Sequence, residues 1–189
     1  MSINSKQSVK CPQCGQMSDI TVWNSITVSD SPDLKNDLLS GKVNMFHCPS
    51  CGHTALMPTP MLYHDESKRL MISFSPTNDA VLKQQLFDNV KSSSRESGEL
   101  ERLIGYNLRF VTDYNELLEK LLIFDNGFND KAIEVIKLMV LSQDVDKSEQ
   151  RICRFGKCEN GAIEFMIHDF IENKIYTSKV PEETYDKIY

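Results

Sequence analysis

Two short segments of this 189-residue chain repeat one cysteine pattern, and the pattern could bind a metal. CPQCG occupies residues 11–15 and CPSCG occupies residues 48–52, so each contains two cysteines separated by two residues. The proline after the first cysteine presets φ for a tight turn, and the glycine after the second tolerates positive φ. Two such turns supply four thiolates, the tetrahedral set that Zn²⁺ prefers. The pattern predicts one structural Zn²⁺ per chain, bound by Cys11, Cys14, Cys48 and Cys51.

A site of this kind would be closed, because protein side chains would fill all four coordination positions, and it should not activate water. Iron is the other metal that a four-cysteine set suits. His47 and His53 flank the second segment. With four thiolates present neither imidazole is needed as a ligand, so we expect them to support the ligands or to face solvent.

Two other interpretations of the four cysteines stay open. They could be small buried hydrophobic residues, although scattered cysteines rarely repeat a five-residue pattern. They could also form a thiol redox switch, because a C-P-x-C turn occurs in thioredoxin-like oxidoreductases, where the first thiol has a lowered pKa. That chemistry is typical of a single motif beside a βαβ unit, whereas this chain has two motifs and no such unit around either. The metal site is the favoured prediction.

Cys153 and Cys158 form a second, weaker cysteine pair, separated by four residues. This spacing lacks the proline and glycine of the two repeated segments. Disulfides are uncommon in the cytosol, so we expect two free, packed thiols here.

His64 and Asp65 are the one pair that could orient an imidazole for acid–base chemistry. Neighbouring residues on a strand point to opposite faces, so the pair does not make a catalytic dyad by itself. The sequence has no G-x-S-x-G, P-loop or dinucleotide fingerprint. An enzyme with a cleft near His64 and Asp65 is therefore the alternative function, and no catalytic residue is assigned.

The charge distribution argues against nucleic-acid binding. The net charge is −6, and residues 1–60 carry four lysines and four aspartates with no arginine or glutamate. Proteins that bind phosphate backbones need clustered basic residues, and no basic stripe is present. No run of ~18 apolar residues could span a membrane, and the first ten residues contain no apolar signal segment. We expect a soluble, cytoplasmic protein without membrane association.

The residues between the two cysteine segments must fold back to bring the segments together. Residues 20–28 alternate apolar and polar, which predicts a strand. Ser31 and Pro32 begin a predicted helix that ends near Gly41, and residues 43–46 form a second strand that leads into Cys48. Residues 53–65 and 68–76 are typical of two strands around a polar turn.

The rest of the chain changes from helix to strand. A helix is predicted over 79–91, a polar connection over 92–99, a helical stretch from Leu100, and helices over 113–125 and up to Ser142. Residues 151–158 and 162–170 should form a hairpin at an Asn-Gly turn, with a third strand over 174–180. The predicted fold class is α+β: a zinc-ribbon-like antiparallel β part at 1–76, a helical region at 77–143 and a small antiparallel sheet at 144–189, or 77–189 as one domain.

The sequence resembles the CpXC domain proteins of bacteria and archaea. The resemblance rests on CPQCG, Trp23-Asn24 after it, DSPDLKNDLLSGKVNMFHCPSCG and MLYHD, and it covers about the first 125 residues. Because the family is functionally uncharacterised, the resemblance implies a shared fold and metal site but no activity. The predicted function is a zinc-ribbon protein of uncharacterised role, more a regulator or interaction protein than an enzyme, whose helical and C-terminal parts bind a protein partner.

Overall fold

The computed structural model describes residues 1–77, 81, 84–85, 88, 104–143 and 150–189. It divides into two compact units, Met1–Leu117 and Leu118–Tyr189. Most of the helix expected over 79–91, all of the connection over 92–99, and Leu100 lie outside the described residues. None of the helices in the described part of the chain is long and apolar enough to cross a membrane.

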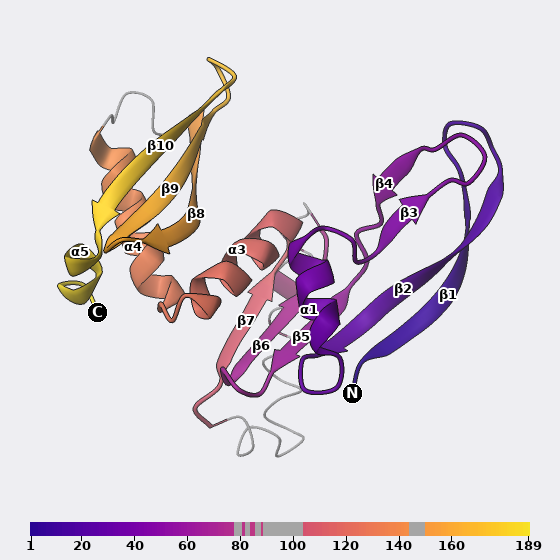
Figure 1. Ribbon diagram of the computed structural model, residues 1–189, viewed down its shortest axis with the longest axis horizontal. Helices are drawn as coiled ribbons and strands as arrows, with labels where there is room; N and C mark the ends of the chain where they lie inside the picture. The colour runs from indigo at the N-terminus through magenta and orange to yellow at the C-terminus, as the bar shows by residue number, and fades with distance from the viewer. Residues whose placement is uncertain (78–80, 82–83, 86–87, 89–103, 144–149) are drawn as a thin grey trace. The chain divides into compact units, whose positions relative to one another are not determined.

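The N-terminal unit is built on a five-stranded sheet with the order β1-β2-β5-β6-β7 (Figure 1). Its strands are β1 (Ile3–Lys10), β2 (Met17–Thr27), β5 (Met61–Asp65), β6 (Leu70–Phe74) and β7 (Asn107–Val111). β1–β2 and β5–β6 pair antiparallel, whereas β2–β5 and β6–β7 pair parallel. The sheet is therefore mixed, where the sequence analysis expected an antiparallel one.

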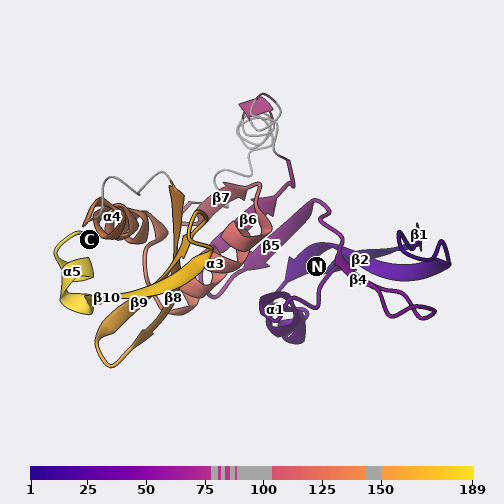
Figure 2. The same cartoon turned by 90° about the horizontal axis from the view of Figure 1, so that it is seen from above.

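The parallel pair β2–β5 requires a crossover, and the segment with the second cysteine motif supplies it. This segment contains α1 (Pro32–Leu39) and the short hairpin of β3 (Met45–His47) and β4 (Thr54–Leu56). Pro32 at the first helical position and Gly41 at positive φ after the last turn delimit α1 as predicted. The β1–β2 ribbon and the β3–β4 hairpin extend together away from the other strands (Figures 1 and 2).

Two further sequence predictions in this unit are wrong in detail, and one strand was not predicted. Residues 53–65 form two strands instead of one, because Pro58 and Pro60 lack the amide N–H that a continuous ladder needs. β7 lies within the stretch expected to be helical, where five residues pair with β6 across a parallel ladder. β1 was not predicted, since its side chains are almost all exposed and leave no apolar alternation to detect.

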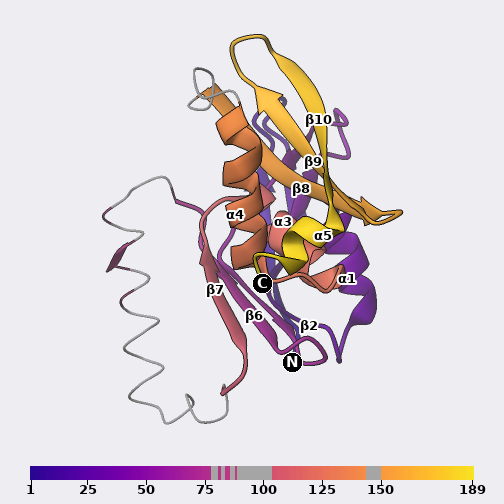
Figure 3. The same ribbon diagram turned by 90° about the vertical axis from the view of Figure 1, so that its left-hand side faces the viewer.

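The C-terminal unit is a three-stranded antiparallel sheet packed on helices (Figure 3). Its order is β10-β9-β8, with β8 (Arg151–Glu159), β9 (Ala162–Asp169) and β10 (Lys174–Pro181). Asn160 and Gly161 both have positive φ, as the predicted Asn-Gly hairpin turn requires. α4 (Asp130–Leu141) and the short α5 (Glu182–Asp186), which the sequence did not indicate, contribute to one hydrophobic core with this sheet. The predicted α+β fold class is confirmed.

A buried carboxylate ties α3 (Tyr114–Asp125) to α4 and β8 within this unit. Glu119 accepts a hydrogen bond from the backbone N–H of Phe155 at 2.7 Å and lies 3.0 Å from Lys137 Nζ. Arg154 Nη1 approaches its other oxygen at 3.4 Å. Burial would lower the pKa of Lys137, but the carboxylates of Glu119 and Glu134 outweigh burial and raise it.

We predict that Glu119→Ala lowers the free energy of unfolding of the C-terminal unit by about 3 kcal/mol, because the partly buried ammonium of Lys137 and the buried N–H of Phe155 lose their shared acceptor. Glu134→Ala is the matched control, since Glu134 also contacts Lys137, at 2.9 Å, but its side chain is 46% exposed. Glu134→Ala should lower the free energy of unfolding by at most about 0.5 kcal/mol. Urea unfolding followed by circular dichroism measures both, and equal effects of the two variants would contradict the prediction.

Candidate metal centre

The first cysteine motif forms a tight turn at the end of the β1–β2 ribbon. The backbone N–H of Cys11 donates to Gln16 O at 2.8 Å, and the N–H of Gly15 donates back to Cys11 O at 2.9 Å. Gly15 has a φ of 76°, a conformation that strains residues with a Cβ atom. The turn therefore directs Cys11 and Cys14 to one side.

The second motif repeats this geometry at the end of the β3–β4 hairpin. The N–H of Cys48 donates to His53 O at 2.8 Å, and the N–H of Gly52 donates to Cys48 O at 3.0 Å. Gly52 has a φ of 72°. The repeated sequence pattern thus corresponds to a repeated backbone turn, hereafter called a knuckle, at residues 11–16 and 48–53.

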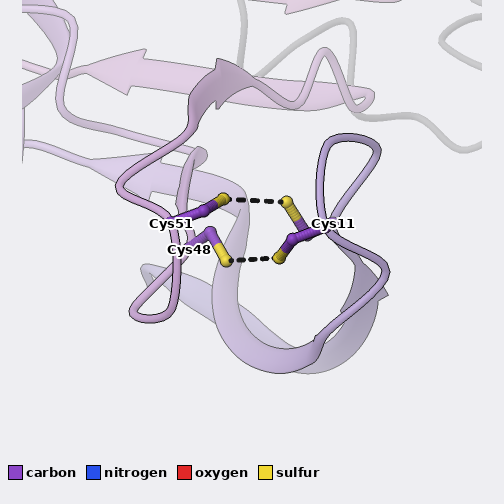
Figure 4. A group of neighbouring side chains, drawn as sticks. Cys11, Cys48 and Cys51 are labelled. Carbon is purple, nitrogen blue, oxygen red and sulfur yellow. Dashed lines mark hydrogen bonds between the residues drawn. The ribbon is translucent and has the colours of Figure 1, made fainter.

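The two knuckles face one another and bring four sulfur atoms together (Figure 4). Cys11 Sγ lies 3.7 Å from Cys51 Sγ, and Cys14 Sγ lies 3.5 Å from Cys48 Sγ. All four sulfurs lie within 4.8 Å of one another. Tetrahedral coordination with metal–sulfur bonds of about 2.3 Å implies sulfur–sulfur separations of about 3.8 Å. The observed geometry therefore fits a single tetrahedral metal ion.

Each knuckle contributes one buried and one exposed cysteine. Cys11 and Cys48 are buried in a small hydrophobic cluster with Phe46. Partly buried residues packed against this cluster come from the β1–β2 ribbon and from the residue that follows β4: Val9, Ile20 and Met57. Cys14 and Cys51 are exposed. The cluster thus supports the four sulfurs from one side and leaves the other side open to solvent.

The four thiols have unequal pKa values because they share hydrogen bonds. Burial works to raise the pKa of Cys48, but backbone hydrogen bonds from Cys51 and Ser50 and its thiol neighbours lower it to about 6. A backbone hydrogen bond at His53 favours the thiolate of Cys51, yet burial and the neighbouring sulfurs raise the pKa of Cys51 to about 12. Negative charge on one sulfur therefore opposes ionisation of its neighbour, and a divalent cation would remove that opposition.

The flanking histidines lie outside this four-sulfur group. His47 is exposed, and the half-buried ring of His53 lies 6.5 Å from the ring of Phe46, centroid to centroid. The prediction that neither imidazole is needed as a ligand agrees with their placement.

Cys153 and Cys158 lie on β8 in the C-terminal unit, and both are free thiols. Cys153 belongs to the hydrophobic core of that unit, where burial raises its pKa to about 11. The pKa of the half-buried Cys158 is also raised, first by burial and then by Glu182. Neither thiol is activated, as expected for packed cysteines.

His64 and Asp65 point to opposite sides of β5, as their neighbouring positions on a strand predict. Asp65 is buried and accepts hydrogen bonds from Ser67 Oγ at 2.6 Å and Lys35 Nζ at 3.2 Å. His64 is half-buried, with Nε2 3.3 Å from the hydroxyl of Tyr106. The two side chains therefore do not form a dyad, and Asp65 instead anchors α1 to the sheet.

Two β-hairpins that each end in a cysteine knuckle, with four sulfurs at tetrahedral spacing, define a protein with a four-cysteine site that could hold a metal ion. The family model described as CpXC protein matches residues 9–137, so the chain belongs to the CpXC family. This confirms the resemblance noted in the sequence. No curated protein and no solved structure matches the chain.

The placement of Asp65 predicts a specific dependence of stability on pH. Burial raises the pKa of Asp65, but Ser67, Lys35 and the N–H of Lys68 outweigh it and hold the pKa below its ordinary value. Since the pKa is lower in the folded than in the unfolded state, the carboxylate stabilises the fold above about pH 4, and this contribution disappears as the pH falls through the lowered pKa.

We therefore expect the unfolding free-energy difference between wild type and Asp65→Asn to be constant from about pH 5 to 7 and to shrink below about pH 4. Urea unfolding at each pH can be followed by the fluorescence of the single tryptophan, Trp23 in β2. Acid also protonates the cysteine thiols, but it does so in both proteins, so their difference isolates Asp65. A difference that stays constant down to pH 2 would refute this assignment.

Proposed function

We propose that this protein binds one structural Zn²⁺ per chain through Cys11, Cys14, Cys48 and Cys51. The observation that supports the proposal is the approach of four thiols from two separate hairpins to within 4.8 Å of one another. The chemistry of the donor set favours zinc, which takes four thiolates in a closed tetrahedral site, with iron as the competing metal.

The metal's role in this proposal is to hold the two hairpins together. The β1–β2 ribbon has little buried surface, because most side chains of β1 are exposed. The cluster beneath the sulfurs contains three buried residues, two of which are Cys11 and Cys48 themselves. Burial of so few side chains supplies little stability, so a shared ion is the main cross-link between the hairpins. The protein is then a metal-stabilised, non-enzymatic module.

The second part of the proposal is that the C-terminal unit binds a protein partner. Alternation along its strands places Ile152, Met166 and Ile175 on the face opposite to the buried Phe155 and Phe165, and each of the three is at least 40% exposed. We call this the outer sheet face. Exposed apolar side chains gathered on one face are a common feature of protein interaction sites. We also propose a cytoplasmic location, because all six cysteines are free thiols and a reducing compartment keeps them so.

The first test is metal analysis of the purified protein together with a count of reactive thiols. We expect one zinc per chain and no fast-reacting thiol in the native protein, because the metal would hold four cysteines and the pKa values of Cys153 and Cys158 are raised. All six thiols should react after denaturation in the presence of a chelator. Cys14→Ser and Cys51→Ser should each lose the metal and destabilise the two hairpin ends that carry the knuckles, because metal binding and local folding are coupled at such sites.

Cys158→Ser is the matched control, since it removes a thiol outside the four-sulfur group and should keep one zinc per chain. A Cys51→Ser variant that keeps the stability of wild type without metal would overturn the structural role. A metal-free wild type with fewer than six thiols after denaturation would instead favour the redox switch.

The interaction proposal predicts that a photo-reactive amino acid placed at Met166 forms a covalent adduct with a discrete protein partner in cells. Ile175→Asp should abolish the adduct, because it places a charge on the same outer sheet face, whereas Lys187→Asp, at an exposed position just after α5, should not. Gel electrophoresis and mass spectrometry of the adducts distinguish these results. An adduct that persists in Ile175→Asp would count against this face as the binding site.

A further inference from the structure

Asn44 occupies an unusual position between α1 and the second knuckle. Its φ is 57°, in the left-handed region, and only 6% of the residue is exposed. Asparagine tolerates this conformation better than most residues do. The sequence analysis placed Asn44 inside a strand, but this backbone conformation delays the start of β3 until Met45.

The side-chain amide of Asn44 pairs with both main-chain groups of Trp23 on β2. Its Oδ1 accepts a hydrogen bond from Trp23 N at 2.7 Å, and its Nδ2 donates to Trp23 O at 3.0 Å. Nδ2 also donates to Thr59 Oγ1 at 2.9 Å, in the segment between β4 and β5. Three hydrogen bonds of a buried amide are thus satisfied by two other segments of the chain.

These contacts extend the hydrogen-bond ladder on one edge of β2. On that edge β2 pairs with β5 at Ser25, Ile26 and Thr27. Trp23 lies two residues before this pairing begins, and the amide of Asn44 there takes the place of a strand's peptide group. The backbone of Asn44 is held as well, since its carbonyl accepts from Met57 N at 2.8 Å.

The distance from Asn44 to each knuckle makes this contact important for the sulfurs. Cys48 follows Asn44 by four residues, about 13 Å of extended chain. On the other hairpin, Met17 is the first residue of β2 after the first knuckle, and it precedes Trp23 by six residues, about 20 Å. The relative placement of the two knuckles therefore depends on how the bases of the hairpins are aligned. A slip of one residue in this alignment would turn Phe46 away from Cys11 and Cys48.

We propose that Asn44 is a positioning residue for the metal site: its side-chain amide aligns the β3–β4 hairpin with β2 so that the two knuckles face each other before a metal binds. This inference rests on the proposed function, because it assumes that the four sulfurs bind a metal. Asn44 touches none of the four cysteines in this scheme and acts through the hairpins that carry them. Prealignment lowers the ordering cost that binding would otherwise have to overcome.

Comparing Asn44→Gly with Asn44→Ala separates the effect of losing the side-chain hydrogen bonds from the effect of straining the backbone at positive φ. Glycine accepts positive φ without strain but removes all three side-chain hydrogen bonds. We expect both variants to bind Zn²⁺ about 10- to 100-fold more weakly than wild type in a chelator competition, a range typical of residues that orient ligands. Asn44→Asp keeps an acceptor for Trp23 N–H and should restore part of the affinity.

Ile72→Val is the control for a general loss of stability, because it trims a fully buried residue of β6, a strand of the same sheet that pairs with β5 and β7 and with neither hairpin. It should leave metal affinity within about twofold of wild type, since Ile→Val changes in cores are mild. With Co²⁺ as the probe metal, the sulfur-to-cobalt absorption of Asn44→Gly should keep its wild-type shape, because the same four sulfurs remain the ligands.

Hydrogen exchange at the Trp23 amide gives a readout that does not depend on metal. In metal-free protein we expect this amide to exchange at least tenfold faster in Asn44→Gly than in wild type, with Ile72→Val unchanged. Wild-type affinity in Asn44→Gly, or an equal loss in Ile72→Val, would overturn the inference. If wild type itself bound no zinc, the proposed metal function would fail, and unchanged Trp23 exchange would then still overturn the alignment role of Asn44.

Discussion

The ends of the two hairpins in the N-terminal unit depend on the mutual constraint among the four sulfur atoms that they carry. Thiols at 3.5 and 3.7 Å across the knuckles cannot all ionise unless a cation neutralises them. Their pKa values diverge accordingly: backbone hydrogen bonds and neighbouring thiols lower the pKa of Cys48 to about 6, while burial and the neighbouring sulfurs raise that of Cys51 to about 12. A metal ion satisfies all four at once. Everything else in this part of the fold, from the glycines at positive φ to the cluster around Phe46, brings these sulfurs to one point.

The hairpin ends that carry the knuckles and the C-terminal unit achieve stability by different means. Among its described residues, the C-terminal unit has a hydrophobic core of eleven buried residues from α3, α4, α5, β8, β9 and Phe128, with the buried Glu119 linking two helices to β8. The knuckle region has only three buried residues in its cluster. Because the free energy gained by apolar burial scales with the buried area, the hairpin ends that carry the knuckles need bonds of another kind, whereas the C-terminal unit can rely on packing. Metal binding should therefore stabilise these hairpin ends far more than the C-terminal core.

How well the sequence predicted the structure depended on the range of each interaction. The knuckles, α1 and the Asn160–Gly161 turn follow from local signals, namely paired cysteines, Pro32 at a helix start and an Asn-Gly pair. β1 escaped prediction because its side chains are exposed, and β7 because its partner β6 lies more than thirty residues earlier in the chain. For Asn44 the sequence indicated only a place in a predicted strand and in the segment shared with the family. Its role arises from Trp23 and Thr59, which no local pattern connects to it.

The same geometry separates a metal site from a dithiol switch. In a thioredoxin-like motif the two cysteines of one turn react with each other. Here the sulfur–sulfur hydrogen bonds, Cys11–Cys51 and Cys14–Cys48, run between the knuckles, and each pairs a buried cysteine with an exposed one. Each knuckle supplies only two of the four sulfurs. The two turns are closed in the same way, since the N–H of Gly15 donates to Cys11 O and the N–H of Gly52 donates to Cys48 O. Two equivalent half-sites that meet at one centre are what a shared tetrahedral ion requires, and a single redox-active turn would need only one of them.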